Sequence, residues 1–359
     1  MQINLFFKKQ NMKKKSLSAK KAIHNSLLNN LKNKKINKFF KVFKNNLNKH
    51  RERKFKIGVA VSGGPDSLAL AFLSKCYLLI NELEGKFFIV DHKIRKESSK
   101  EAESVKLLLK KFDINCEILK WEGVKPHSNI QSIARNNRYN LLKKACERNN
   151  INHLLIGHHL DDLYENFFIR LLRGSGLKGL ASFGEAIKEE DNKISLLRPL
   201  IRFQKKDLIY ISKSVFQFFI EDPSNKNFVF KRIRIRNLIS ELNKEGLDTK
   251  KLDLTIRNLK SANTSINFYV EKNIKDNAKF NKQKNIYILN KYFFKQSEEV
   301  IFRSISLVLK KVSERYYSPR GKSLLALILK INSNNSNKFT LGGCYIEKIN
   351  ETILITREN

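Results

Sequence analysis

Cysteine is scarce in this chain, which has four among its 359 residues: Cys76, Cys116, Cys146 and Cys344. They are widely separated, and no two form a Cys-x-x-Cys pair. The sequence therefore predicts neither a zinc ribbon nor an iron–sulfur centre. Free thiols, the usual state in a reducing compartment, are expected instead.

Long apolar runs are missing as well. No run of about 18 apolar residues occurs, so we expect no membrane-spanning helix. The apolar run near the N-terminus, Ile3–Phe7, is too short for a secretory signal. These two absences favour a cytoplasmic protein.

Acidic residues are absent from residues 1–51, and Glu52 is the first in the chain. The formal net charge of the whole chain is +37, which predicts a polyanionic partner, with nucleic acid as the first candidate. A Lys- and Asn-rich composition throughout the chain also contributes to this charge. An organelle transit peptide is an alternative interpretation of the basic N-terminus.

Apolar residues recur at helical spacing over Ala22–Phe43, which predicts one amphipathic helix in a basic extension, residues 1–52. From residue 54 onward, short apolar runs alternate with longer helical patterns. Such alternation is typical of an α/β fold with a parallel sheet and helices on both faces. Strands are expected at Ile57–Val61, Phe87–Asp91, Cys116–Lys120 and His153–Gly157, and helices at Asp66–Ile80, Ser99–Phe112, Ser128–Arg148 and Leu160–Leu172.

The rest of the chain is predicted to be mostly helical, with short strands near its C-terminus. We therefore divide the sequence into the extension 1–52, an α/β domain 53–215, a helical domain 216–297 and a small α+β subdomain 298–359. The expected helices are Lys205–Phe219, Phe230–Leu242, Leu247–Ile274, Glu298–Val312 and Lys322–Ile331, and the expected strands are Phe339–Leu341, Cys344–Lys348 and Ile353–Thr356.

The stretch Val61-Ser-Gly-Gly-Pro-Asp-Ser67 joins a predicted strand to a predicted helix. Glycines let the backbone approach a phosphate closely, and backbone N–H groups at a helix start attract anions. Gly63 and Gly64 supply the turn, Ser62 and Ser67 supply hydroxyl donors, and Asp66 is a ligand for Mg²⁺. No Gly-Lys-Ser/Thr follows, so this is not a Walker loop. An ordinary strand-to-helix turn is the alternative.

A second polar cluster spans Gly157–Asn166 and also leads from a strand into a helix. Asp162 and Glu165 are three residues apart, so they share a helix face and suit either binding of a cationic group or proton abstraction. His158 could contact a phosphate or a developing charge. A metal-hydrolase site and a plain N-capped helix are the alternatives.

Two further clusters are weaker signals. Asp91–Arg95 ends the second strand, where a nucleotide base or ribose would be met. Arg135 and Arg138 lie one turn apart on a predicted helix. Because ligands of parallel sheets bind at the carboxyl ends of the strands, the clusters at 62–67, 91–95 and 157–165 are expected at one edge.

The motifs, taken in order, carry a family resemblance. Ser62–Ser67, including Pro65, resembles the pyrophosphate loop of the N-type ATP pyrophosphatases, and the full set resembles the tRNA(Ile)-lysidine synthetase family over about residues 55–240. The further matching segments are Asp91–Arg95, Ala134–Tyr139, His158–Glu165, Arg170–Leu180, Arg198–Leu200, Glu221–Asn225, Leu341–Cys344 and Thr356–Glu358.

The resemblance implies a two-step ligation. ATP adenylates the wobble cytidine of tRNA(Ile) with a CAU anticodon, and free L-lysine then displaces AMP to form lysidine. The implied cofactors are ATP and Mg²⁺, no membrane is involved, and a homodimer is left open. Another tRNA modification, such as thiolation, and a non-catalytic basic RNA-binding protein are the competing functions.

The resemblance also implies roles for single residues. His158 would lie near the adenylated group, Asp162 and Glu165 would bind lysine, and Arg138 would stabilise the intermediate. The chain departs from the family pattern at Leu163, Asn166 and Ile233. The residues that would hold the ATP phosphates and Mg²⁺ are Ser62, Gly63, Gly64, Pro65, Asp66 and Ser67, and those that would face tRNA or the intermediate are Arg135, Arg232, Arg234 and Arg236.

Overall fold

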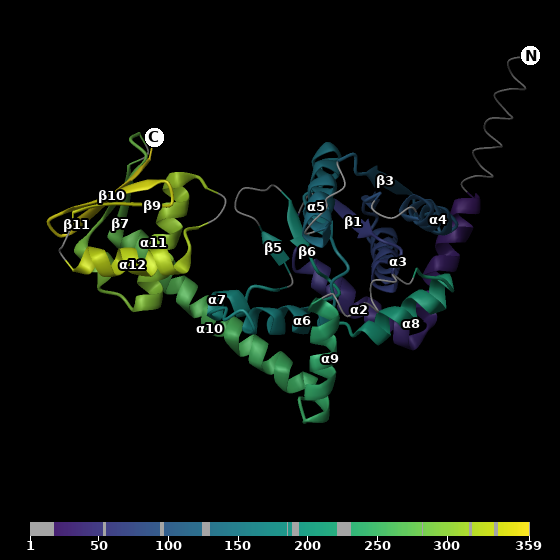
Figure 1. Cartoon of the computed structure of the whole chain (residues 1–359). Helices are drawn as coiled ribbons and strands as arrows, with labels where there is room; N and C mark the ends of the chain where they lie inside the picture. Colours follow the sequence, from purple (N-terminus) through teal and green to yellow (C-terminus); the bar gives the residue numbers. More distant parts are fainter. Residues whose placement is uncertain are drawn as a thin grey trace, which may run out of the picture. The chain divides into compact units, whose positions relative to one another are not determined.

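The computed structural model divides the chain into two compact units, Met1–Ser175 with Ser182–Asp248, and Gly176–Ala181 with Thr249–Asn359. We call them the N-terminal and C-terminal units and describe each by itself (Figure 1). The structure describes residues 18–52, 55–93, 97–123, 130–184, 186–188, 194–220, 231–281, 283–315, 318–333 and 337–358.

The N-terminal unit is built on a sheet whose described strands run in the order β3-β2-β1-β4-β6-β5. All neighbouring pairs are parallel except β5 and β6, so the expected parallel sheet is confirmed and gains an antiparallel edge strand. The sequence did not predict β5 or β6. The strands are β1 (Ile57–Val61), β2 (Gly85–Asp91), β3 (Cys116–Lys120), β4 (His153–Leu155), β5 (Ala186–Lys188) and β6 (Ser195–Leu197).

Helices cover both faces of this sheet (Figure 1). Strand side chains alternate between faces, so Ile57, Val59 and Val61 of β1 pack into the core formed with α3 and α4. Phe88 of β2 and Leu154 of β4 belong to a second core formed with α5. The helices are α3 (Pro65–Ile80), α4 (Ser98–Lys110), α5 (Ile130–Arg148), α6 (Leu160–Leu171), α8 (Lys205–Phe216) and α9 (Lys231–Lys244).

The basic extension differs from its prediction. The single helix expected over residues 22–43 is two helices, residues 18–29 and α2 (Lys34–Asn48), separated by a short 3-10 turn, Asn30–Lys32. Asn33 has an extended backbone, and its Oδ1 accepts hydrogen bonds from the N–H groups of Lys35 and Ile36 at 3.0 and 3.2 Å. An asparagine in this arrangement is an N-cap, which starts a new helix.

The extension is packed on the sheet domain. Leu27, Phe40 and Phe43 are buried in the same core as β1 and α3. On the neighbouring surface, the ring Nε2 of His24 lies 2.6 Å from the carboxylate of Asp113. The burial of these apolar side chains places the described part of the extension within the N-terminal unit.

The C-terminal unit holds an antiparallel sheet in the order β7-β8-β11-β10-β9. Its core includes Ile305 and Leu309 of α11 and Ile346 and Ile355 of the sheet. The expected C-terminal strands are confirmed. The elements are α7 (Leu177–Leu180), α10 (Thr249–Asn277), β7 (Ala278–Asn281), β8 (Ile286–Leu289), a 3-10 turn (Lys291–Phe294), α11 (Glu298–Ser313), α12 (Gly321–Asn332), β9 (Lys338–Leu341), β10 (Cys344–Ile349) and β11 (Thr352–Arg357).

The segment 216–297, expected to be helical, also contains β7 and β8. These strands are four residues long. Ala278-Lys-Phe-Asn281 is largely polar, and the apolar run Ile286–Leu289 is short and was not predicted as a strand. The boundary between the compact units falls after Asp248, inside this segment. Our division of the chain into four parts stays a prediction. Among the described residues, no helix is long and apolar enough to cross a bilayer.

Candidate active site

The site is formed where the strand order of the N-terminal sheet reverses. The chain continues from β1 through β2 to β3 on one side, whereas β4 pairs with the other side of β1. A crevice forms at the carboxyl ends of such strands. A Cβ placed on Gly157 would lie 3.5 Å from the backbone of Asp66 and Ser67. The two motif loops, 62–67 and 157–165, are therefore adjacent, as the sequence predicts.

The loop after β1 is held by hydrogen bonds within the loop and by close packing against α4. Gly63 has φ of +85°, and a Cβ there would come within 2.5 Å of Val105, so only glycine fits. The backbone N–H of Ser62 donates to Ser67 Oγ at 3.0 Å, and that hydroxyl donates to the Gly64 carbonyl at 2.9 Å. Pro65 opens α3, in agreement with its fixed φ.

Asp66, in the first turn of α3, faces Lys205 and His159. Its Oδ2 accepts a hydrogen bond from Lys205 Nζ at 2.6 Å and lies 3.7 Å from His159 Nε2. Its Oδ1 is buried, with no hydrogen-bond partner among the described residues. Sequence reasoning assigned no role to Lys205 or His159. The only local signal was that Lys205 opens a predicted helix.

The two carboxylates of α6 face arginines of α9. Arg236 Nε donates to Glu165 Oε1 at 2.5 Å, and Arg232 Nη1 lies 3.6 Å from Asp162 Oδ1. Glu165 is 1% exposed, and its Oε2 has no hydrogen-bond partner among the described residues. His159 is the N-cap of α6, and its N–H donates to Asp162 Oδ2 at 3.1 Å. The acidic pair is thus built to bind cations.

The two carboxylates differ in acidity. Burial raises the pKa of Glu165 above its ordinary value, and the ion pair with Arg236 offsets only part of this. Burial also acts to raise the pKa of Asp162, but the charges of His159 and His158 and the hydrogen bond from the His159 N–H outweigh it, so that pKa is lowered. Asp162 therefore stays ionised at a lower pH than Glu165.

His158 contacts different neighbours from His159. Arg198 Nε donates to His158 Nδ1 at 3.2 Å, and the ring of Phe183 lies edge-on to the imidazole at 5.5 Å. Burial lowers the pKa of His158 to about 3, and the positive charge of Arg198 acts in the same direction. Because the adjacent histidines face different partners, the geometry argues against joint metal ligation.

The arginines of α5 extend the positive region. Arg135 and Arg138 flank Tyr139, whose ring lies 5.2 and 5.6 Å from the two guanidinium carbons. Burial lowers the pKa of Arg138, and the charges of Arg135 and Arg232 act in the same direction. Partial burial lowers the pKa of His92, and the charge of Arg138 acts in the same direction. Residues from α5, α9 and the loop after β2 therefore share one electrostatic environment.

Some of the predicted residues lie away from the site or outside the described residues. Asp91 accepts hydrogen bonds from the hydroxyls of Ser98 and Ser99 at 2.8 and 2.6 Å, so its carboxylate holds the start of α4. Arg234 is exposed on α9. Residues 94–95 and 221–225 lie outside the described residues.

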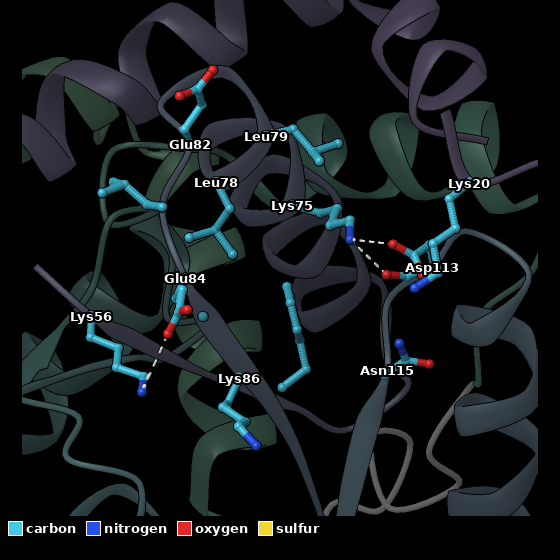
Figure 2. Close-up of a pocket in the computed structure, with 13 residues that line it drawn as sticks. Lys20, Lys56, Lys75, Leu78, Leu79, Glu82, Glu84, Lys86, Asp113 and Asn115 are labelled. Carbon is cyan, nitrogen blue, oxygen red and sulfur yellow. Dashed lines mark hydrogen bonds and ion pairs between the residues drawn. The ribbon is translucent and has the colours of Figure 1, made fainter. Parts of the chain in front are cut away.

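A pocket of about 630 Å³ lies at the opposite edge of the sheet, beside the starts of β1, β2 and β3 (Figure 2). It contains two ion pairs: Lys75 Nζ lies 3.0 Å from Asp113, and Lys56 Nζ lies 3.5 Å from Glu84. None of its lining residues is a predicted site residue, so the site is defined by the motif loops and not by this pocket.

Metal-binding clusters are absent from the part of the chain that the structure describes. No group of three or more His, Cys, Asp or Glu side chains there could hold a metal ion. The four cysteines are buried free thiols, as the sequence predicts.

Comparison with known proteins agrees with this architecture. Residues 30–242 match the family described as the PP-loop domain. The solved U34-tRNA thiolase NcsA from Methanococcus maripaludis superposes with a TM-score of 0.51 at 19% identity, covering 62% of this chain and 79% of that one. At this identity the likeness concerns the fold alone.

Curated relatives are more similar in sequence. The tRNA(Ile)-lysidine synthase of Wolbachia pipientis wMel is 34% identical over 321 residues, covering 89% of this chain and 74% of the relative. That of Orientia tsutsugamushi (strain Boryong) is 35% identical over 318 residues, covering 84% and 70%. The sequence similarity covers both the loop 62–67 and the acidic pair of α6. This chain belongs to the tRNA(Ile)-lysidine synthase family of PP-loop proteins.

Proposed function

We propose that this protein ligates free L-lysine to the wobble cytidine of tRNA(Ile) with a CAU anticodon, using ATP and releasing AMP and pyrophosphate. The family relationship supports an ATP-dependent tRNA modification. One observation carries the finer proposal: the phosphate loop adjoins the acidic pair of α6. His159 Nε2 lies 3.7 Å from Asp66 Oδ2 and 3.5 Å from Asp162 Oδ2, and both carboxylates of the pair contact arginines.

ATP would be held by the loop 62–67 and the start of α3. Gly63 and Gly64 leave room for the phosphates, and Ser62 and Ser67 line the loop. The residues fit a divalent cation, because the buried Asp66 Oδ1 has no partner among the described residues and oxygen is the ligand that Mg²⁺ prefers. Asp66 would hold Mg²⁺, which would neutralise phosphate charge.

Adenylation makes chemical sense for this substrate. The cytosine carbonyl oxygen is a poor leaving group, whereas an oxygen linked to AMP leaves readily. Lysine has a side-chain pKa of about 10.4, so only roughly one molecule in a thousand is neutral at pH 7. A group in the site must therefore accept a proton before the amine attacks.

We propose that Asp162 and Glu165 bind the lysine side chain. Asp162 keeps its charge because its pKa is lowered, which suits electrostatic capture of an ammonium group. Glu165 has a raised pKa, which suits a group that accepts a proton. The incoming amine would exchange with the guanidinium groups of Arg232 and Arg236, which contact these carboxylates.

The remaining assignments follow the same logic. Arg138 would stabilise the adenylated intermediate, and His158 would contact the reacting group. The target base must leave its stack, which costs a few kcal/mol, and contacts to tRNA phosphates from Arg135 and Arg234 would help offset this.

Free lysine, ATP and tRNA occur together in the cytoplasm, where we place the reaction. Homodimer formation stays a prediction for sedimentation analysis.

The decisive experiment incubates the purified protein with ATP and labelled lysine. One sample receives an isoleucine tRNA transcript with a CAU anticodon, and the other receives elongator methionine tRNA, which has the same anticodon. We expect label in the first tRNA alone. Label in neither, with ATP–pyrophosphate exchange intact, would contradict lysine as the nucleophile.

Two other outcomes separate the competing functions. Sulfur incorporation into tRNA would favour a thiolase, although the four cysteines are buried free thiols. Binding of tRNA without any ATP–pyrophosphate exchange would favour a non-catalytic RNA-binding protein. The presence of Asp66, His158, Asp162 and Glu165 counts against that alternative, because a protein that only binds RNA has no need of these residues.

A further inference from the structure

His158 and Arg198 leave neighbouring parallel strands. His158 follows β4 and Arg198 directly follows β6, and the pair Leu155–Leu197 is in register between these strands. The ladder extends past the strand ends, because the Ile156 N–H donates to the Leu197 carbonyl at 3.0 Å. The backbone therefore brings the two side chains together.

The hydrogen bond between them has a fixed direction. Arginine has only donors, so the Nδ1 of His158 must be the acceptor of the Arg198 Nε–H at 3.2 Å. A ring nitrogen that accepts carries no proton. In a neutral imidazole the single proton is then on Nε2.

Arg198 is itself firmly held. It is 2% exposed, its Nη1 donates to the Gly184 carbonyl at 2.9 Å, and its guanidinium lies 4.3 Å from the centre of the Phe183 ring. The next residue is anchored from α2, because Asn46 Nδ2 donates to the Pro199 carbonyl at 3.0 Å. Such restraint allows one side chain to select the state of its neighbour.

We propose that Arg198 is a positioning residue that fixes His158 as the neutral tautomer with its proton on Nε2. His158 then acts in adenyl transfer as a hydrogen-bond donor to an anionic oxygen, and not as a general base. His158 neither gains nor loses a proton during the reaction, and its Nε2–H bond stays intact.

The charges around His158 support a neutral ring. Arg198 after β6 and both Arg135 and Arg138 of α5 act against protonation, while Asp162 of α6 acts in its favour. Burial adds to the arginines, and together they keep the pKa of His158 at about 3. The ring therefore stays neutral at physiological pH.

The first test needs no substrate. Nitrogen NMR of ¹⁵N-histidine-labelled protein distinguishes a protonated from a bare ring nitrogen, and the spectrum of His158→Gln identifies its signal among the seven histidines. We expect a bare Nδ1 and a protonated Nε2 at pH 7. In Arg198→Met, which keeps an unbranched side chain but has no N–H donor, we expect a mixture of tautomers.

The second test is kinetic and rests on the proposed function. Glutamine can place an amide N–H near the former Nε2, whereas asparagine reaches only the position of Nδ1. For ATP–pyrophosphate exchange with tRNA, His158→Asn should lower kcat roughly a hundredfold, and His158→Gln should lower it about tenfold. The KM for ATP should change little in both.

The third test uses pH. Arg198→Gln removes a positive charge beside His158, so the pKa of the ring rises above its value in the wild-type chain. In a ¹⁵N-monitored titration, Nδ1 of this variant should gain a proton at a higher pH than Nδ1 of the wild-type chain, and an unchanged titration would contradict the effect assigned to Arg198. Arg148→Lys, an exposed change in the ion pair with Glu117, is the matched control.

The outcomes are separable. A protonated Nδ1 in the wild-type protein would overturn the inference even if lysine is ligated as proposed, and even if the Arg198 variants fail to fold. Equal rates for His158→Gln and His158→Asn would also contradict it. Failure of lysine ligation, with the expected tautomer, would overturn the proposed function and leave the positioning role of Arg198 intact.

Discussion

At the scale of single residues, environment separates two carboxylates that share one helix face. Asp162 is near two histidines and accepts the N–H at the start of α6, whereas Glu165 is buried one turn further on. Their pKa values therefore move in opposite directions. Such a difference lets one group hold a charge while the other exchanges a proton.

The Glu165→Gln variant tests this division. We expect ATP–pyrophosphate exchange to be retained and the KM for lysine to rise about ten- to a hundredfold, because a charge-assisted hydrogen bond is worth roughly 1.5–3 kcal/mol. Steady-state lysine incorporation measures this. Glu241→Gln, an exposed change on α9, is the control. An unchanged KM for lysine would contradict the assignment of Glu165.

The same residue predicts a pH dependence. The pKa of Glu165 is raised above 4.5, so the carboxylate is charged only at higher pH. The KM for lysine should therefore fall as the pH rises through the raised pKa of Glu165. Asp162 is already ionised at this pH because its pKa is lowered, so it adds no pH dependence to the KM for lysine. In Glu165→Gln the KM for lysine should not change with pH. A pH dependence that persists in this variant would show that another group titrates.

Asp66→Asn tests the phosphate loop. The variant preserves the size of the side chain but removes its negative charge. In the wild-type chain, Asp66 Oδ1 is buried without a hydrogen-bond partner among the described residues. We expect ATP–pyrophosphate exchange to fall by at least about a hundredfold, since electrostatic stabilisation of charge in the site is lost. Exchange at the wild-type rate would show that Asp66 is dispensable.

At the scale of elements, α2 shows how one side chain starts a helix. Asn33 caps α2, and the buried face of that helix carries Ile36, Phe40, Phe43 and Leu47. Through Asn46, the same helix also anchors the turn at Pro199. The basic extension therefore supports the site as well as adding charge.

Asn33→Ala should lower the free energy of unfolding of the N-terminal unit by about 1 kcal/mol, because the first-turn N–H groups of α2 lose their acceptor. Denaturant unfolding followed by circular dichroism measures the change. Asn33→Asp keeps the acceptor and is expected to retain most of the stability, although its side chain loses the donor to Tyr210. Equal losses in both variants would assign the effect to Tyr210.

At the scale of the whole molecule, charge is the dominant property. The net charge is +37, and α2 contains no acidic residue. Attraction to phosphates of this kind carries no base information, but it speeds and strengthens tRNA binding. Recognition of one anticodon must then come from the site.

This predicts a steep salt dependence of tRNA binding. If about six phosphates are neutralised, affinity falls by roughly three orders of magnitude between about 50 and 200 mM salt, because bound counterions are released. Filter binding or fluorescence titration measures the slope. A flat response would rule out the basic surface as the source of affinity.

Prediction from sequence succeeded where the signal is local. The apolar run Ile57–Val61, the glycine turn and the helix that starts at Pro65 follow directly from neighbouring residues, and the structure agrees to within a residue. The break at Asn33 was missed, because helical spacing continues across it. The short polar strand Ala278–Asn281 was also missed, because its pairing with β8 and not its own pattern makes it a strand.

The amino-acid sequence alone determined the α/β alternation, the phosphate loop and the acidic pair, because each depends on residues a few positions apart. Only the tertiary structure decided which partners these groups have. Arg198 and His158 are 40 positions apart, Arg236 and Glu165 are 71 apart, and Lys205 and Asp66 are 139 apart. Contacts of that kind arise from strand order and helix packing, which no local spacing encodes.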